Sequence, residues 1–477
     1  MKGGGSKVKV KGRDLTFILI VLVCTTIIML SWERTPVLLS ASLLPAKDLF
    51  LSFLPSIQFA EISPNLTDME KKDKVVFTEA AGEEDQTAEK APSLREAAQG
   101  DPNHSLNMTS QGAVDQNTSV VGDKQVCNYG KGKWVRDDNV TLYSGFDCKQ
   151  WLAPGWACRT MPRTDFSYEM LRWQPKDCQL QRFNGDEFLK RMQGKTIAFV
   201  GDSLGGEQFQ SLMCMITGGS ESNDVLDVGA EYGFTIPEHG RVVRNENGRP
   251  DGWAYRFTTT NTTVLHHWSA CLCDLEPIVT EDPNKRHHYY AMHLDRPPSF
   301  LRENLHRIHV LVMNTAYHWT RQKLIRNRWV MHVGGIRKTN ETLRTLGEAK
   351  NFTIHSVVGW VNSQLQENPQ LQAFYRSISP RHFSGGDWNT GGSCDNTTPR
   401  YVGKEVVEAV SSDHVSRSAV QGTGVKLLDI TSLSSVRDEG HISRYSLTAK
   451  PGVQDCLHWC LPGVPDTWNE ILVAQIK

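Results

Sequence analysis

The chain has 477 residues, of which 39% are hydrophobic, and its formal net charge is −1. A chain of this length can bury one large core or two smaller ones. A net charge this close to zero creates no field that would attract a polyanion, which argues against a nucleic-acid partner.

The N-terminus has the pattern of a membrane anchor. Residues 15–32 are apolar except for three threonines and a serine, and the 14 residues before them carry five basic side chains, at Lys2, Lys7, Lys9, Lys11 and Arg13. We therefore expect a cytosolic tail over 1–14 and a membrane-spanning helix over 15–32, with the body in the lumen. A cleaved signal peptide is the alternative, because small residues occur at 40–42, but the apolar run exceeds a usual signal-peptide core.

Residues 33–124 are expected to form a luminal stem. From about Ser63 to Lys124 the stem is rich in Glu, Asp, Gln, Ala, Ser and Thr, with almost no aromatics and no apolar period, which predicts disorder. The chain also has nine Asn-x-Ser/Thr triplets, which indicate a glycosylated luminal protein; they begin at Asn65, Asn103, Asn107, Asn117, Asn139, Asn261, Asn340, Asn351 and Asn396.

The cysteines favour the same compartment. One of the eleven, Cys24, lies in the expected anchor, and the other ten follow the stem, where an oxidising lumen allows them to pair. A zinc site made by His266, His267, Cys271 and Cys273 is a weaker alternative, because the Cys-x-Cys spacing departs from the usual gap of two to four residues.

The body begins with a segment of little periodicity. Residues 127–178 are rich in Trp, Gly, Pro and Arg, which predicts a loop-rich lobe held by disulfides. We assign 125–185 to this lobe and 186–477 to the main domain.

The main domain opens with a strand-to-helix turn. The apolar run 197–200 predicts a buried strand, Gly201, Asp202 and Ser203 follow directly, and a helix is predicted over 207–215. Ser203 would then project from the carboxyl edge of a sheet, with its own N–H near a helix N-terminus that can stabilise an oxyanion. This position suits a nucleophile. The alternative is that Ser203 only caps the helix; a phosphate loop is disfavoured because no Lys-Ser/Thr pair follows the glycines.

Further strands are predicted over 308–313 and 425–431, with a helix over 402–415 between them. This alternation is typical of a parallel sheet covered by helices on both faces. Asn314 follows its strand as Ser203 does. Its amide is a candidate donor to an oxyanion, although an asparagine after a strand is often a turn residue.

Near the end of the chain, Asp455 and His458 stand three residues apart in a short segment that we interpret as a disulfide-pinned loop. A carboxylate beside Nδ1 fixes the imidazole tautomer that presents Nε2 to a serine hydroxyl. A solvent-facing Asp and His remain the alternative. Asp202 is a competing partner for His458, but as the neighbour of Ser203 it is better placed to shape the turn.

These motifs together resemble the trichome birefringence-like proteins of plants, which are polysaccharide O-acetyltransferases related to SGNH/GDSL esterases. The likeness covers essentially all of 127–477 and is carried by CNYGKGKWVRDD, RWQPKDCQLQRFNG, FVGDSL, SPRHFSGGDWNTGGSCDNTTP and QDCLHWCLPGVPDTWNEIL. Two stretches depart from the family: Gly205-Gly206-Glu207 stands where Ser-Arg-Asn or Gly-Arg-Gln is common, and DEGH before and at His441 replaces an RDGH-like run.

The resemblance implies an α/β fold, an SGNH-like three-layer α/β/α core with a mainly parallel sheet, and a disulfide-stapled N-terminal lobe. It implies a catalytic triad of Ser203, His458 and Asp455, and an oxyanion site made by the Ser203 N–H and Asn314. It also implies four disulfides, Cys127–Cys178, Cys148–Cys214, Cys158–Cys460 and Cys394–Cys456, which leave Cys271 and Cys273 outside the shared set.

The expected activity is O-acetyl transfer through an acetyl-serine to a cell-wall polysaccharide such as xylan, mannan, xyloglucan or pectin. No metal or bound cofactor is expected; acetyl-CoA or a luminal acetyl carrier would be the co-substrate, and a Golgi acetyl-donor transporter is a possible partner. The expected location is the Golgi membrane, as a single-pass type II protein. An acetyl esterase and a non-catalytic polysaccharide binder are the alternatives. Trp268, Trp319, Trp388 and Trp468 are candidates for stacking on sugars, but each is at least as well explained as a core residue, and the sequence does not choose between the two.

Overall fold

The computed structural model describes residues 127–138, 141–234, 251–278, 289–338, 345–406, 413–447 and 449–477. The expected cytosolic tail, membrane anchor and stem, residues 1–124, lie outside these ranges, so their assignments stay predictions. Within the described ranges, no helix is both long enough and apolar enough to cross a membrane.

A seven-stranded sheet forms the centre of the body. Its order is β14 (Lys426–Leu428), β12 (Gln372–Arg376), β9 (Val310–Met313), β3 (Thr196–Gly201), β6 (Thr262–Trp268), β5 (Gly252–Phe257) and β4 (Val225–Asp227). Neighbours from β14 to β6 are parallel, whereas the β6–β5 and β5–β4 pairs at one edge are antiparallel. Because β3 and β9 are parallel neighbours, their carboxyl ends meet at one edge of the sheet.

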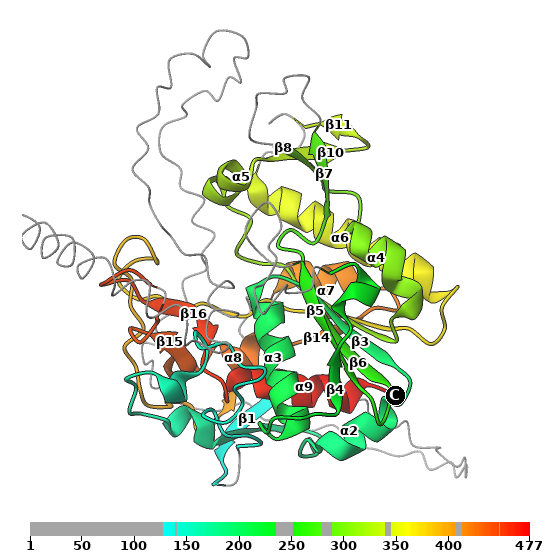
Figure 1. The fold of residues 1–477 in the computed structure, drawn as a ribbon. Helices are drawn as coiled ribbons and strands as arrows, with labels where there is room; N and C mark the ends of the chain where they lie inside the picture. The colour runs from blue at the N-terminus through cyan, green and yellow to red at the C-terminus, as the bar shows by residue number, and fades with distance from the viewer. Residues whose placement is uncertain are drawn as a thin grey trace, which may run out of the picture.

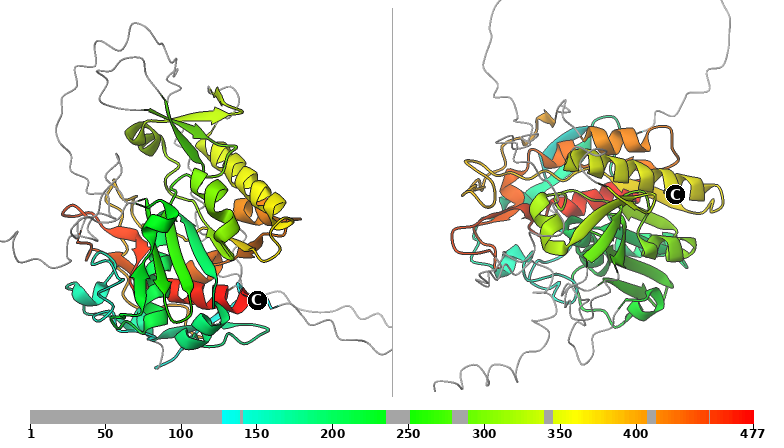
Figure 2. Two further views of the ribbon diagram at one scale, coloured as in Figure 1. Left: turned by 45° about the vertical axis from the view of Figure 1, so that its right-hand side comes forward. Right: turned by 90° about the horizontal axis from the view of Figure 1, so that it is seen from above.

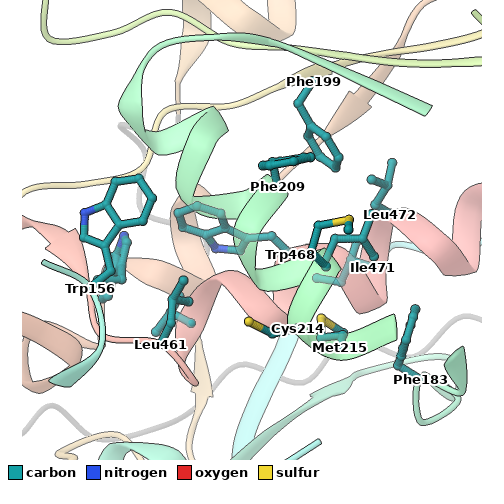
Figure 3. Packing of buried hydrophobic residues seen from close by; sticks show 14 of the residues in the cluster. Trp156, Phe183, Phe199, Phe209, Cys214, Met215, Leu461, Trp468, Ile471 and Leu472 are labelled. Carbon is teal, nitrogen blue, oxygen red and sulfur yellow. The ribbon is translucent and has the colours of Figure 1, made fainter. Parts of the chain in front are cut away.

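Helices cover both faces of this sheet (Figures 1 and 2). On one face, Ile197 and Phe199 of β3 pack in a core shared with α3 (Ser203–Thr217) and α9 (Val464–Gln475). On the other face, Ala198 and Val200 pack in a core with α4 (Ser299–Asn304), α6 (Leu346–Leu365) and α7 (His414–Val420). Figure 3 shows Phe199 next to Phe209 of α3, with Leu472 of α9 nearby. The strand alternation therefore divides the interior into the three layers of an α/β/α fold.

The N-terminal lobe packs into the first of these cores. Its strands β1 (Gly132–Arg136) and β2 (Leu171–Pro175) are antiparallel, and the short β13 (Glu405–Val406) adds to β1. The lobe also contains η4 (Cys158–Thr160) and η5 (Ser167–Met170), and α2 (Gly185–Arg191) leads on to β3. Trp134, Trp156 and Trp173 are fully buried in the same core as α3, so the lobe shares its interior with the main domain.

A second sheet lies at the top of Figure 1, in the order β11 (Ile336–Arg337), β10 (Trp329–Val333), β8 (Tyr289–His293) and β7 (Asp274–Ile278). A two-stranded ribbon is formed by β15 (His441–Ser443) and β16 (Asp455–Trp459). The remaining short helices of the described ranges are η6 (Gly229–Tyr232), η7 (Leu305–Arg307), α5 (Arg321–Asn327), α8 (Thr431–Ser434) and η8 (Asp438–Gly440).

The strand predictions are confirmed by β3, β9 and β14, except that β14 ends at Leu428 and Thr431 already begins α8. The helix predicted over 207–215 lies inside α3, which begins at Ser203. The helix expected over 402–415 is wrong. Val402 forms a bridge to Trp134, and the strand of residues 405–406 pairs with β1, so backbone pairing with the lobe outweighs the helical pattern there. Residues 407–412 lie outside the described ranges, and α7 begins at His414.

Candidate active site

Asp202 organises the turn that presents Ser203. Its Oδ1 accepts hydrogen bonds from the Leu204 N–H at 3.0 Å and from Nδ2 of Asn314 at 2.6 Å, and its Oδ2 accepts from the Ala316 N–H at 3.1 Å. Asp202 is therefore the N-cap of α3, and Ser203 is the first helical residue. The buried Asp202 carboxylate also joins the ends of β3 and β9, which leaves Ser203 partly exposed at the carboxyl edge of the sheet.

Asp455 and His458 come to Ser203 on β16, which is a strand and not the loop expected from the sequence. Oδ2 of Asp455 lies 2.9 Å from Nδ1 of His458, and Nε2 of His458 lies 2.8 Å from Oγ of Ser203. Oδ1 of Asp455 accepts from the backbone N–H groups of Leu457 and His458. With its hydrogen on Nδ1, the imidazole donates to the carboxylate and its Nε2 is free to accept the serine proton.

The charges of this pair reinforce one another. Burial lowers the pKa of His458, but the carboxylate of Asp455 and its hydrogen bond outweigh burial and raise that pKa above its ordinary value. Burial opposes ionisation of Asp455, yet the charge of His458 and the hydrogen bonds from His458 and Leu457 hold the pKa of the carboxyl well below its usual range. The arrangement favours an imidazolium beside a carboxylate, the charge state that follows proton transfer from a serine.

The N-terminal lobe contacts the imidazole directly, through a residue that sequence reasoning missed. The ring of Trp156 stacks on His458 with centroids 6.0 Å apart, and the carbonyl of Trp156 accepts from the Leu461 N–H at 2.9 Å. Trp156 is two residues before Cys158, whose disulfide to Cys460 ties the lobe to the end of β16. The expected Cys158–Cys460 pairing is the sequence signal that places Trp156 near His458.

Asn314 lies against the turn that presents Ser203, as its position after β9 predicts. A Cβ at Gly201 would come within 2.1 Å of Oδ1 of Asn314, and a Cβ at Gly205 within 2.5 Å, so the absence of side chains at both glycines makes room for this amide. One Nδ2 hydrogen is donated to Asp202. Donation of the other to an oxyanion stays a prediction.

The four expected disulfides are present: Cys127–Cys178, Cys148–Cys214, Cys158–Cys460 and Cys394–Cys456. Cys271 and Cys273 are buried and free. Across the described part of the chain, no three His, Cys, Asp or Glu side chains are placed to hold a metal ion, and that includes the alternative set with His266 and His267.

Two of the four tryptophans considered for sugar stacking are core residues. Trp468 is fully buried and donates to Oγ of Ser434, and Trp319 is buried and donates to the hydroxyl of Thr315. Trp268 is half-buried, and Trp388 is 37% exposed. The sequence does not reveal which tryptophans are covered, because that depends on packing against distant elements.

Comparison with known proteins shows the family of this chain. A model of the PMR5 N-terminal domain matches residues 125–179, and a model described as a GDSL/SGNH-like acyl-esterase family found in Pmr5 and Cas1p matches residues 180–475. Protein trichome birefringence-like 14 of Arabidopsis thaliana is 54% identical over 371 residues, which cover 75% of this chain and 88% of that protein. The chain belongs to the trichome birefringence-like family.

Other relatives in the trichome birefringence-like family give the range of similarity. Protein trichome birefringence-like 15 of Arabidopsis thaliana is 53% identical over 361 residues, which cover 74% of this chain and 71% of that protein. Xyloglucan O-acetyltransferase 1 of Populus trichocarpa is 28% identical over 394 residues, which cover 77% of this chain and 85% of that protein. These matches support polysaccharide acetylation in general, with acetyl transfer or ester hydrolysis as the chemistry.

Proposed function

We propose that this chain is an O-acetyltransferase that moves an acetyl group through an acetyl-Ser203 intermediate to a hydroxyl of a plant cell-wall polysaccharide. The observation that carries the proposal is the contact of Oγ of Ser203 with Nε2 of His458 at 2.8 Å, with Asp455 on the opposite nitrogen. A serine hydroxyl becomes a useful nucleophile when a base within hydrogen-bond reach removes its proton.

In the first half-reaction, His458 accepts the Oγ proton while Oγ bonds to the acetyl carbonyl carbon. The Ser203 N–H and the free hydrogen of Asn314 Nδ2 are the proposed donors to the oxyanion. The bond from acetyl to the donor then breaks, and the departing group takes the proton from His458. The donor is acetyl-CoA or a luminal acetyl carrier.

In the second half-reaction, a sugar hydroxyl gives its proton to His458 and attacks the acetyl-serine carbonyl. The bond to Oγ breaks, Ser203 recovers the proton, and the acetylated polysaccharide leaves. Hydrolysis differs only in that water replaces the sugar hydroxyl, so an acetyl esterase is the second candidate. The acyl-esterase description of the matching family model supports this second candidate.

We also propose that the protein resides in the Golgi membrane as a single-pass type II protein, with residues 15–32 as the anchor and an acetyl-donor transporter as a partner. The apolar run, the nine glycosylation triplets and the four disulfides support a luminal body.

The decisive experiment incubates the full chain, purified in detergent, with a labelled acetyl donor and separate xylan, mannan, xyloglucan and pectin acceptors. Label on one polymer is the expected result, and it also identifies the acceptor. Free labelled acetate without labelled polymer supports the esterase. Retention on polymer with neither product leaves a binding protein and overturns the proposal.

A further inference from the structure

The peptide that joins His458 to Trp459 is held by side chains on both of its polar groups. The His458 carbonyl lies 3.0 Å from Nδ1 of His441, and the Trp459 N–H donates to Oε1 of Glu207 at 2.7 Å. Glu207 and His441 are 0% and 1% exposed, so water does not compete for these contacts.

Glu207 reaches this peptide from the nucleophile helix. It stands four residues after Ser203 on α3, and side chains four apart lie on the same face of a helix. The helix that carries the nucleophile thus also holds the backbone next to the base. Glu207 therefore couples the position of β16 to that of Ser203.

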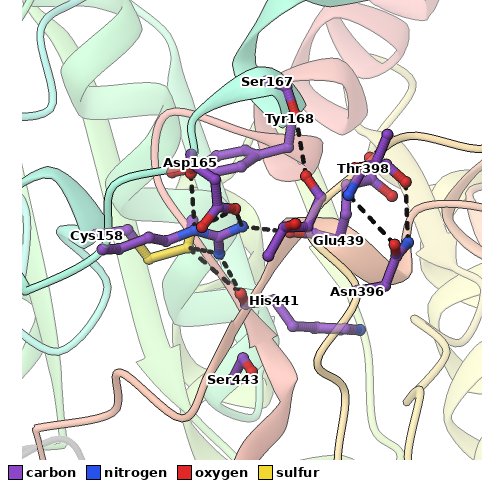
Figure 4. Close-up of polar contacts among 12 residues, drawn as sticks. Cys158, Asp165, Ser167, Tyr168, Asn396, Thr398, Glu439, His441 and Ser443 are labelled. Carbon is purple, nitrogen blue, oxygen red and sulfur yellow. Dashed lines mark hydrogen bonds and ion pairs between the residues drawn. A yellow bond between two sulfur atoms is a disulfide. The ribbon is translucent and has the colours of Figure 1, made fainter.

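His441 reaches the same peptide from β15 and is itself fixed. Its ring stacks on Trp459 with centroids 3.9 Å apart, and its Nε2 lies 2.6 Å from Nδ1 of His382. Its backbone carbonyl accepts from Arg163 of the lobe at 2.6 Å. Figure 4 shows His441 beside Glu439 and close to the disulfide of Cys158.

We propose that Glu207 and His441 are positioning residues that clamp the peptide joining His458 to Trp459, and so hold the imidazole at hydrogen-bond distance from Ser203. The proposal rests on the proposed function. Among the strands of the described residues, β16 pairs only with β15, and a two-stranded ribbon by itself is marginally stable. A displacement of about 1 Å at a reacting group costs on the order of 10²-fold in rate, so a device that holds this ribbon in place affects turnover.

Both residues lie in the two stretches where the chain departs from the usual family runs, Gly205-Gly206-Glu207 and DEGH up to His441. The structure brings Glu207, which is a departure, and His441, the histidine that both DEGH and RDGH share, to opposite sides of one peptide. Burial raises the pKa of Glu207 to about 8, which leaves the side chain mostly uncharged at neutral pH. An uncharged side chain serves as a hydrogen-bond acceptor, a role that glutamine can also fill.

The test measures kcat and KM of the full chain for hydrolysis of p-nitrophenyl acetate, which reports attack by the serine whatever the natural acceptor. We expect Glu207→Leu to lower kcat on the order of 10²-fold with KM little changed. Glu207→Gln keeps the size and the accepting oxygen, so its kcat should stay within about threefold of the wild-type value.

Glu470→Leu is the matched control. Glu470 is a partly buried glutamate whose Oε1 accepts one backbone N–H, that of Phe183 at 3.4 Å, on α9. It makes the same kind of contact away from His458, so the substitution should alter thermal unfolding and leave kcat unchanged.

A second pair of variants tests the other side of the clamp. In His441→Asn the amide nitrogen takes the place of Nδ1, whereas His441→Leu offers no donor. We expect the asparagine variant to have the higher kcat, although both lose the stacking on Trp459. If Glu207→Leu does not fold, the comparison of the two His441 variants tests the proposal.

The clamp is overturned if Glu207→Leu keeps the wild-type kcat while Ser203→Ala is inactive, or if Glu207→Gln is as slow as Glu207→Leu. It is also overturned if His441→Leu matches His441→Asn. A wild-type rate in Ser203→Ala instead removes the proposed function, which separates the two failures.

Discussion

Oγ of Ser203 lies 2.8 Å from Nε2 of His458, although the two residues are 255 positions apart in the chain. The contact joins the first turn of a helix to a strand outside the central sheet. Neither residue depends on the other for its own secondary structure, so the contact can be removed without dismantling the fold.

Ser203→Ala should therefore abolish acetyl transfer and ester hydrolysis while leaving stability unchanged. Asp202, not Ser203, caps α3, so the substitution removes the proposed nucleophile but not the cap. We expect a loss on the order of 10⁴-fold or more. Rates and thermal unfolding midpoints are measured together, with Ser211→Ala on the same helix as the control. Oγ of Ser211 bonds Asp466, so that variant should lose stability and keep activity.

Asp455→Asn should lower kcat on the order of 10⁴-fold, because an amide favours the wrong imidazole tautomer. It should also move the pH dependence. Catalysis needs neutral His458, whose pKa the Asp455 carboxylate raises, so the wild-type rate increases as pH rises through that raised pKa. Without the carboxylate, the remaining activity should increase at lower pH. A pH–rate profile that does not move would exclude Asp455 as the cause of the raised pKa.

The same pair predicts how stability changes with pH. The folded-state pKa of His458 is raised, so its contribution is complete below the unfolded-state pKa and is lost as pH rises through the folded value. The folded-state pKa of Asp455 is lowered, so its contribution is present above the unfolded-state pKa and is lost in acid. The free energy of unfolding of Asp455→Asn should therefore change less than that of the wild type at both the acidic and the basic end of the pH range. Denaturant titrations at a series of pH values measure this difference.

Gly205→Ala and Gly206→Ala should have opposite effects although the residues are adjacent. A Cβ at Gly205 would lie 2.5 Å from Oδ1 of Asn314, whereas the nearest neighbour of a Cβ at Gly206 is Cε1 of His266 at 3.5 Å. We expect Gly205→Ala to lose about 1–3 kcal/mol of stability through overpacking. Gly206→Ala should gain about 0.5–1 kcal/mol through helix propensity.

The kcat of these variants tests Asn314 as an oxyanion donor. Displacement of the Asn314 amide by Gly205→Ala should lower kcat, with Gly206→Ala close to the wild type. If Gly205→Ala is destabilised but turns over at the wild-type rate, Asn314 does not stabilise the oxyanion.

Replacing both Cys158 and Cys460 with serine should lower the free energy of unfolding by about 2–5 kcal/mol. This disulfide spans 302 positions, against 51 for Cys127–Cys178, and in the chain-entropy model the longer loop stabilises more. Because Cys460 follows His458 by two residues, kcat should fall as well. The Cys127/Cys178 double serine variant is the comparison; an equal or larger loss of stability there contradicts the loop-length account.

Local sequence was enough to predict the strand, the turn and the helix around Ser203. The apolar run of 197–200 is buried on both faces, and such a run leaves little alternative to a central parallel strand. The prediction that Ser203 pairs with His458 did not come from local sequence, since no periodicity links residues 255 positions apart. It came from the resemblance to a family in which both motifs occur together.

The failures share one physical cause, which is that distant contacts decide local structure. Residues 402–406 look helical but complete the sheet of the lobe, and Asp455 and His458 lie on a strand because β15 is there to pair with β16. The sequence left open whether Trp319 and Trp468 face sugars or the core, and the fold covers both. The contacts of Glu207 and His441 with the peptide that joins His458 to Trp459 were not predicted either, because they form only when α3, β15 and β16 come together.

The bond between Cys158 and Cys460 closes a covalent ring that contains Ser203, Asp455 and His458. A protease that cuts once at any peptide within this ring cannot release either fragment, because the pieces remain attached through sulfur. A nicked molecule should thus migrate as one species on a non-reducing gel and as two after reduction, and it should retain its activity until the reductant is added.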